Sequence, residues 1–131
     1  MRSLVVEDDP VSQKLMATIL SSYGSCDVAE DGERGVRCFR EAYEGGSPYD
    51  LVCLDIMMPG MNGQKALKEI RAIEEADGRT MLSMAKIVMT SALTDIDSVG
   101  ESYRSLCNAY LAKPIRRGDM VRQLKYLGLA E

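Results

Sequence analysis

Five short apolar runs alternate with longer amphipathic segments along the chain, and this alternation is the strongest constraint on how it folds. The runs hold few polar residues, which is typical of strands buried on both faces of a parallel sheet. They cover residues 4–6, 26–29, 51–54, 87–89 and 109–112. Helical spacing of apolar residues in the other segments predicts five helices. These residues are Val11, Leu15 and Ile19; Val36, Phe39 and Tyr43; Ala66, Ile70 and Ile73; Ile96, Val99 and Tyr103; and Val121, Leu124 and Leu127.

Regular alternation of this kind predicts an α/β fold with right-handed crossovers and helices on both faces of the sheet. A chain of 131 residues with 46% hydrophobic content has room for one ordinary domain. Five units are the size of a flavodoxin-like doubly wound sheet, in which the strand order is 2-1-3-4-5 and ligands bind at the carboxyl ends of the strands. We therefore expect residues 1–131 to form a single domain without an output domain.

The boundaries of the segments carry matching local signals. Asp9 followed by Pro10 is typical of a helix start, and Asn62 is placed to cap the third helix. Gly24 and Gly128 are expected to end the first and the fifth helix.

Composition excludes several kinds of chemistry. The chain has no histidine, which excludes a Ser-His-Asp triad, a histidine-ligated metal and a phosphohistidine carrier. Its 16 basic and 20 acidic residues give a net charge of −4, so we expect no direct binding to nucleic acid.

The four cysteines form no Cys-x-x-Cys pair, and their positions within apolar runs predict buried free thiols in a reducing compartment. The apolar runs are far too short to span a bilayer, and no signal peptide precedes the first of them. We therefore expect a cytoplasmic protein without membrane insertion. The cysteines are Cys26, Cys38, Cys53 and Cys107.

Acidic, hydroxyl and lysine side chains follow four of the five apolar runs, at the edge where ligands are expected. Converging carboxylates repel one another unless a cation is present, and an all-oxygen site with open positions suits Mg2+. Single residues have plainer explanations, because Asp9 alone is a helix cap, Asp55 alone a turn residue and Lys113 alone a surface lysine. Their convergence favours a functional site. The residues are Glu7, Asp8, Asp9, Asp55, Thr90, Ser91 and Lys113.

Taken in order, four motifs make the chain resemble a CheY-like response-regulator receiver domain of bacterial two-component signalling, over essentially its full length. They are LVVEDDP at 4–10, YDLVCLDIMMPGMNG at 49–63, SA at 91–92 and YLAKP at 110–114. The resemblance implies that Asp55 is the phosphoacceptor and that Glu7 and Asp8 bind Mg2+, with Asp8 as the direct ligand. It also implies that Met57 lends its backbone carbonyl to the metal, and that Lys113 pairs with the acyl phosphate.

The resemblance further implies a switch and a set of partners. Ser91 corresponds to the switch hydroxyl, Tyr110 to the switch aromatic, and the bond between Lys113 and Pro114 is expected to be cis. The phosphoryl donor is expected to be a histidine kinase or a histidine phosphotransfer protein, and a downstream protein target is expected to bind the surface of the fourth helix, fifth strand and fifth helix. Departures from the family pattern include Glu7 in place of Asp and a longer connection at 77–85.

The lifetime of the phosphorylated state is expected to depend on the residues two positions after Asp55 and Ser91. These are Met57 and Leu93, and neither offers a hydrogen bond that would orient an attacking water molecule. We therefore expect slow self-dephosphorylation.

Two other functions use related features. A phosphatase of the haloacid dehalogenase type also pairs a strand-end aspartate with Mg2+, but it needs a second aspartate at the position that Met57 occupies here. A flavodoxin-like flavin carrier needs a first loop that binds phosphate. Here that loop carries three acidic residues, Glu7, Asp8 and Asp9, which repel phosphate. The sequence therefore favours a receiver that catalyses only its own phosphorylation and dephosphorylation.

Overall fold

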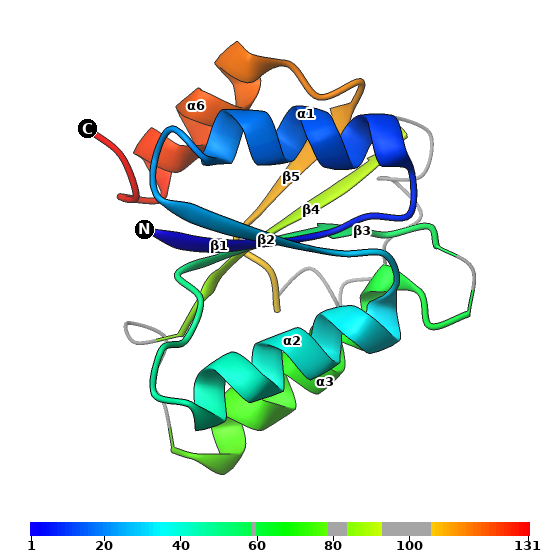
Figure 1. Ribbon diagram of the computed structural model, residues 1–131, viewed down its shortest axis with the longest axis vertical. Coiled ribbons are helices and arrows are strands. Elements are labelled where there is room, and N and C mark those ends of the chain that lie inside the picture. The colour runs from blue at the N-terminus through cyan, green and yellow to red at the C-terminus, as the bar shows by residue number, and fades with distance from the viewer. Residues whose placement is uncertain (59, 79–83, 93–105) are drawn as a thin grey trace.

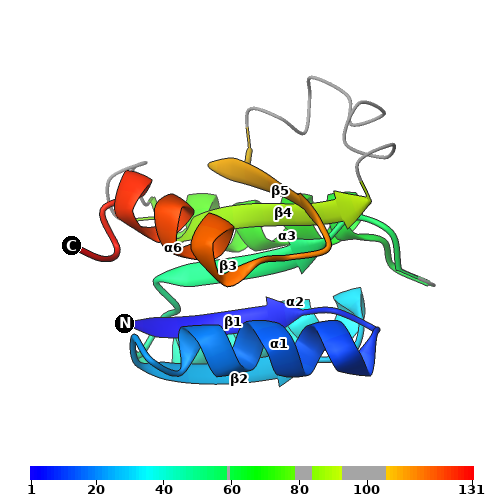
Figure 2. The ribbon, with the colours of Figure 1, turned by 90° about the horizontal axis from the view of Figure 1, so that it is seen from above.

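The computed structural model describes residues 1–58, 60–78, 84–92 and 106–131. Its five parallel strands form one sheet in the order β2-β1-β3-β4-β5, so the predicted fold class and strand order are confirmed (Figure 2). The strands are β1 (Arg2–Val6), β2 (Ser25–Ala29), β3 (Leu51–Asp55), β4 (Lys86–Ala92) and β5 (Ala109–Lys113).

Helices cover both faces of this sheet. Figure 1 shows α1 and α6 on one face and α2 and α3 on the other. They are α1 (Pro10–Leu20), α2 (Gly32–Glu44), α3 (Gly63–Ala76) and α6 (Arg117–Tyr126). The predicted helix with Ile96, Val99 and Tyr103 lies outside the described residues. Within the described part of the chain, no helix has the length and apolar character needed to cross a membrane.

The predicted helix starts are confirmed. Asp9 caps α1 by accepting a hydrogen bond from the Ser12 N–H, with Pro10 in the first turn, and Asn62 caps α3 in the same way through the Lys65 N–H. Helix α6 is followed by Gly128, which has a φ of 76°. The prediction for Gly24 was wrong, because α1 already ends at Leu20 and Ser21 provides its cap.

Side chains that alternate along the strands fill two core layers. One layer, with Leu4, Val52 and Ile87, packs beneath α2 and α3. The second, with Val5 and Cys53, packs beneath α1 and α6. Consecutive residues of a strand therefore face opposite helical layers.

Three expectations about burial are corrected. Strand β2 is mostly accessible, because it is the edge strand of the sheet. Val11 and Leu15 are 77% and 39% exposed, because α1 turns Met16, Ile19 and Leu20 toward the sheet instead.

The prediction of buried thiols holds for one cysteine of four. All four cysteines are free, but only Cys53 is fully buried. The other three, Cys26, Cys38 and Cys107, are partly accessible.

Candidate functional site

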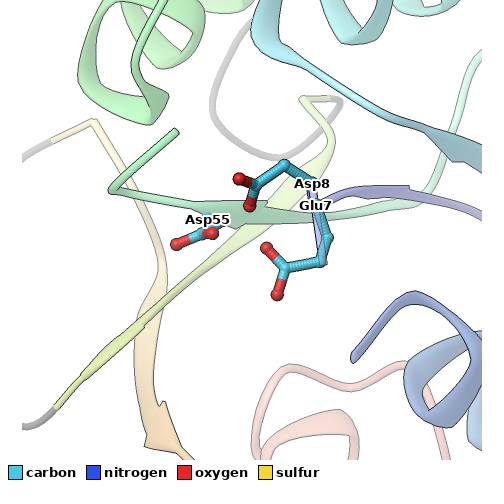
Figure 3. A group of neighbouring side chains, drawn as sticks. All are labelled: Glu7, Asp8 and Asp55. Carbon is cyan, nitrogen blue, oxygen red and sulfur yellow. The ribbon is translucent and has the colours of Figure 1, made fainter. Parts of the chain in front are cut away.

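The predicted acidic residues meet at the carboxyl edge of the sheet. Glu7 and Asp8 follow β1, and Asp55 is the last residue of β3. One carboxylate oxygen from each of the three lies within 4.8 Å of the others, and Figure 3 shows Asp8 and Glu7 beside Asp55. Glu7 and Asp55 are buried whereas Asp8 is exposed, so the group opens to solvent on one side.

This donor set fits Mg2+. All three groups offer hard carboxylate oxygens, which Mg2+ prefers, and the open side leaves room for water or phosphate oxygens. The Oε2 atom of Glu7 is buried and has no hydrogen-bond partner among the described residues. An unpaired buried carboxylate oxygen is costly, and a cation would relieve this cost.

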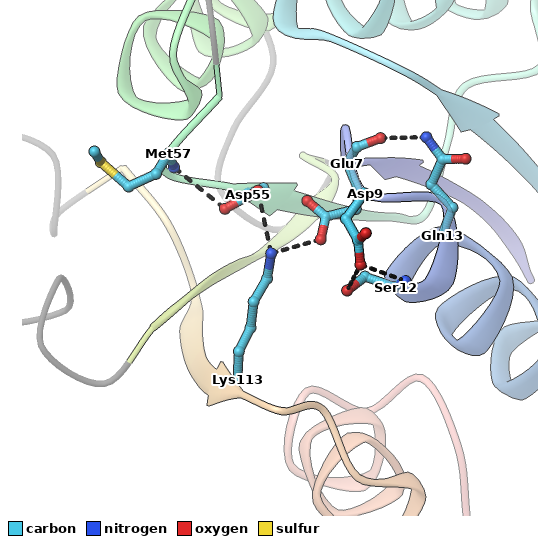
Figure 4. Close-up of polar contacts among 7 residues, drawn as sticks. All are labelled: Glu7, Asp9, Ser12, Gln13, Asp55, Met57 and Lys113. Atoms are coloured by element: carbon cyan, nitrogen blue, oxygen red, sulfur yellow. Dashed lines mark hydrogen bonds and ion pairs between the residues drawn. The ribbon is translucent and has the colours of Figure 1, made fainter.

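Lys113, at the end of β5, bridges two of these acids. Its Nζ lies 2.5 Å from Oε1 of Glu7 and 3.2 Å from Oδ2 of Asp55 (Figure 4). The Lys113 side chain is 25% exposed, whereas those of Glu7 and Asp55 are at most 4% exposed. Two buried acidic side chains therefore share one partly buried lysine.

The same crowding shifts the titration of these groups. Burial, together with the adjacent Glu7 carboxylate, raises the pKa of Asp55 to about 7, and Lys113 opposes this shift. Burial disfavours the charged form of Lys113, but its bonds and charge attraction to Glu7 and Asp55 raise its pKa above the ordinary value. Asp55 is thus held between its charged and neutral forms near neutral pH in the absence of a metal ion.

Neighbouring backbone holds Asp55 in place. The N–H of Met57 donates to Oδ1 of Asp55 at 3.2 Å. The N–H of Gly63 donates to the Ile56 carbonyl at 3.0 Å, so α3 begins directly against the loop after β3. Only glycine fits at 63, because an added Cβ would lie 2.0 Å from the Asp55 carbonyl oxygen. The Met57 side chain itself is 60% exposed.

Two residues near Glu7 show how the first loop is fixed. Asp9 bonds both the N–H and the hydroxyl of Ser12, which confirms its role as a helix cap rather than a member of the acidic group. The amide of Gln13 donates to the backbone carbonyl of Glu7 at 2.5 Å (Figure 4). Gln13 was not predicted from the sequence, because its contact with the Glu7 carbonyl depends on how α1 packs against this loop.

The predicted switch residues lie on neighbouring strands. Ser91 in β4 is 1% exposed, and its hydroxyl has no hydrogen-bond partner within the described ranges. Tyr110 in β5 is partly buried against the core layer beneath α2 and α3. The Lys113–Pro114 bond is cis, as expected. Leu93 lies outside the described residues.

Comparison with known proteins agrees with this geometry. The family model described as a response regulator receiver domain matches residues 3–125. The chain is 34% identical to the chemotaxis protein CheY of Treponema pallidum, over 94% of this chain and 79% of that protein. It is 28% identical to the regulatory protein VanRB of Enterococcus faecalis, over 95% of this chain and 50% of that protein. The chain spans half or less of several other curated relatives that it matches.

Two solved structures are also similar. Response regulator TrrA of Thermotoga maritima, in complex with Mg2+ and BeF, aligns with a TM-score of 0.74 at 30% identity, over 96% of this chain and 97% of that one. The receiver domain of Ssk1 from Saccharomyces cerevisiae, solved with the phosphotransfer protein Ypd1, aligns with a TM-score of 0.80 at 25% identity, over 98% of this chain and 88% of that one.

Proposed function

The chain belongs to the response-regulator receiver domain family, and we propose that Asp55 is its phosphoacceptor and that Glu7, Asp8 and Lys113 enable Asp55 to accept a phosphoryl group. The observation that carries the proposal is the position of Lys113 Nζ, 3.2 Å from the Asp55 carboxylate and beside two further acids. A cation next to a buried strand-end carboxylate suits phosphoryl transfer, in which charge on the transferred oxygens must be offset.

In the proposed reaction, a carboxylate oxygen of Asp55 attacks the phosphorus atom of a phosphohistidine on the donor. The phosphorus–nitrogen bond breaks, and its electron pair returns to the histidine ring. That histidine belongs to the donor, because this chain has none. During transfer, negative charge builds up on the phosphoryl oxygens next to Asp55. Lys113 already contacts Asp55 and is therefore placed to offset that charge.

Receiver domains bind Mg2+ at their acidic pocket, and the residues present here fit that ion. Glu7, Asp8 and Asp55 would hold it, together with the backbone carbonyl of Met57. When bound, Mg2+ supplies positive charge against the phosphoryl oxygens. TrrA, which is similar over nearly the whole chain, was solved with Mg2+ and BeF, and this supports the assignment.

Ser91 and Tyr110 are assigned to the switch. The Ser91 hydroxyl is buried without a partner among the described residues, so it has a donor to offer a phosphoryl oxygen on Asp55. Inward movement of Ser91 would free space for Tyr110 to turn inward. This would change the surface around β5, α6 and the predicted fourth helix, where a downstream protein is proposed to bind.

Receiver domains take their phosphoryl group from histidine kinases or phosphotransfer proteins, and the Ssk1 receiver was solved with Ypd1. A donor of this class is proposed for this chain. Residues 1–131 are proposed to act as one domain through protein contact, with no direct nucleic-acid binding and in the cytoplasm. Its proposed chemistry is limited to its own phosphorylation and dephosphorylation, since Met57 offers no acid for a phosphatase.

Acetyl phosphate with Mg2+ tests the proposal, with intact mass as the readout because the chain has no tryptophan. One phosphoryl group should be added to the wild type and none to Asp55→Asn. Asp50→Asn, which directly precedes the opposite end of β3, is the matched control and should label normally. Full labelling of Asp55→Asn, or labelling that a chelator does not reduce, would overturn the assignment.

A further inference from the structure

Thr90, in β4, has the second buried hydroxyl, after that of Ser91, at the carboxyl edge of the sheet. The proposed function gives Thr90 no role. It is 0% exposed, and its Oγ1 has no hydrogen-bond partner among the residues that the structure describes. Most buried polar groups in proteins are paired, because an unpaired one is destabilising. Valine would fill nearly the same space without that cost.

Strand pairing brings Thr90 next to Asp55. The two residues are directly opposite each other in the β3–β4 ladder. The Ile56 N–H donates to the Thr90 carbonyl at 3.0 Å, which holds this register at the ends of the strands. Directly opposed residues of a sheet point to the same face, so the Thr90 side chain leaves the sheet beside that of Asp55.

The core identifies which face this is. One residue from each of four strands belongs to the core layer beneath α1 and α6, namely Val5, Cys53, Val88 and Leu111. Side chains two residues further along a strand return to the same face. Those side chains are Glu7, Asp55, Thr90 and Lys113. Thr90 therefore lies on the face where Glu7, Asp55 and Lys113 meet in Figure 4.

Asp55 has capacity for another donor. Its carboxylate accepts from the Met57 N–H through Oδ1 and from Lys113 through Oδ2, whereas a carboxylate has about four acceptor sites. Thr90 offers one unused O–H at the neighbouring position of the ladder.

We propose that the Thr90 hydroxyl is a further catalytic group, which donates a hydrogen bond to the Asp55 carboxylate as that carboxylate is released from its acyl phosphate. The inference rests on the proposed function. In this step a water oxygen attacks phosphorus, and the bond between phosphorus and the Asp55 oxygen breaks. The electron pair of that bond stays on the carboxylate, and both water protons leave with inorganic phosphate.

The charge on Asp55 decides whether the Thr90 hydroxyl speeds or slows hydrolysis of the acyl phosphate. Its carboxylate gains negative charge as the bond breaks, and hydrogen bonds to charged acceptors are stronger than those to neutral ones. The Thr90 hydroxyl therefore stabilises the transition state for hydrolysis more than it stabilises the acyl phosphate. Thr90 shortens the lifetime of the phosphorylated protein.

Decay of the purified phosphoprotein tests this inference. The protein is labelled with acetyl phosphate and Mg2+, freed of donor, and followed by intact mass. Thr90→Val removes the hydroxyl and should slow decay by about three- to tenfold. Thr90→Ser retains the hydroxyl and should decay within about twofold of the wild type. Ser3→Ala removes a buried hydroxyl at the far end of β1 and should leave the decay rate unchanged.

A structural role alone would change the melting temperature of Thr90→Val but not its decay rate, so decay at the wild-type rate overturns the inference. If Thr90→Val does not unfold cooperatively, Thr90→Ala and Thr90→Ser form a second pair that differs only in the hydroxyl. Equal decay in that pair also overturns the inference. A wild type that takes up no phosphoryl group would overturn the proposed function first, and this inference with it.

Discussion

The guanidinium of Arg71 lies 2.6 Å from the Glu74 carboxylate in the protein interior, one turn away along α3. Arg71 also donates to the carbonyl oxygens of Ala85 and Leu106 and to the Asn108 side chain, at 2.8, 2.7 and 3.0 Å. Glu74 accepts from the Ala85 N–H at 2.7 Å. This buried cluster ties α3 to the residues that lead into β4 and β5, the two strands that carry the predicted switch.

Removing the acid from this cluster should be strongly destabilising. Glu74→Ala leaves the Arg71 guanidinium, whose side chain is 8% exposed, without its buried counter-charge. We expect the free energy of unfolding to fall by about 3–5 kcal/mol, measured by urea denaturation. Glu75→Ala, on the exposed face of the same helix, should change it by no more than about 0.5 kcal/mol. Similar losses in both variants would argue against the ion pair as the cause.

The crowded carboxylates should make stability depend on pH in metal-free buffer. Because burial raises the pKa of Asp55 from 3.8 to about 7, the folded state retains a proton that the unfolded state has already released between these values. This group therefore lowers the free energy of unfolding as pH rises through that window. Asp55→Asn removes the effect, so its free energy of unfolding should exceed that of the wild type by roughly 2–4 kcal/mol at pH 8.

Urea unfolding with a chelator, at pH 5 and pH 8, measures this difference. Ser3→Ala, which changes no titratable group, should differ from the wild type by the same amount at both pH values. A constant offset between Asp55→Asn and the wild type at both pH values would contradict the raised pKa.

Ser91 and Tyr110 should act as one switch. Ser91→Ala should leave a domain that still takes up phosphate but whose affinity for its partner responds less to phosphorylation. In the double variant with Tyr110→Ala, the loss of this affinity response should be smaller than the sum of the losses in the two single variants. Both changes disable the same transition. Binding titrations with and without phosphorylation provide the four values of the cycle. Additive effects would mean that Tyr110 is only a rim aromatic.

The lifetime of the acyl phosphate should be long. Met57 offers no polar atom suited to orient an attacking water, and Leu93, which lies outside the described residues, has a wholly apolar side chain. One gained water-positioning hydrogen bond of about 1.4 kcal/mol corresponds to about tenfold in rate. We therefore expect Met57→Asn and Leu93→Glu each to accelerate decay by up to about that factor while Asp55 still labels. Mass-resolved decay is the measurement, and unchanged rates in both variants would show that these side chains do not control the water.

The sequence predicted the fold because the central strands contain continuous apolar runs and two of the helix starts carry their own capping residues. Asp9 and Asn62 cap their helices through residues three positions away, which is information that local sequence contains. The acidic edge was predictable for a related reason. Parallel strands bring their carboxyl ends to one edge, so residues that end separate strands, such as Glu7 and Asp55, must become neighbours.

Packing decided what the apolar periodicity left open. Val11 and Leu15 fit a helical stripe, yet α1 rotates them toward solvent because Met16 and Ile19 fill the space above the sheet. Burial of β2 could not be predicted either. The apolar run at 26–29 by itself indicates burial on both faces, whereas the position of β2 at the end of the strand order leaves most of it accessible.

The chemistry of the site depended most on tertiary structure. Lys113 and Glu7 are 106 residues apart, and their contact exists only because β5 and β1 end on the same face of one sheet. The Thr90 hydroxyl becomes a candidate catalytic group only in the folded domain. There the strand register places Thr90 opposite Asp55, and burial removes the hydroxyl from water. Sequence determined which groups reach the edge, because strand ends are local features. Tertiary structure decided which of them touch and how their charges respond, since contact and burial depend on the packing of the whole domain.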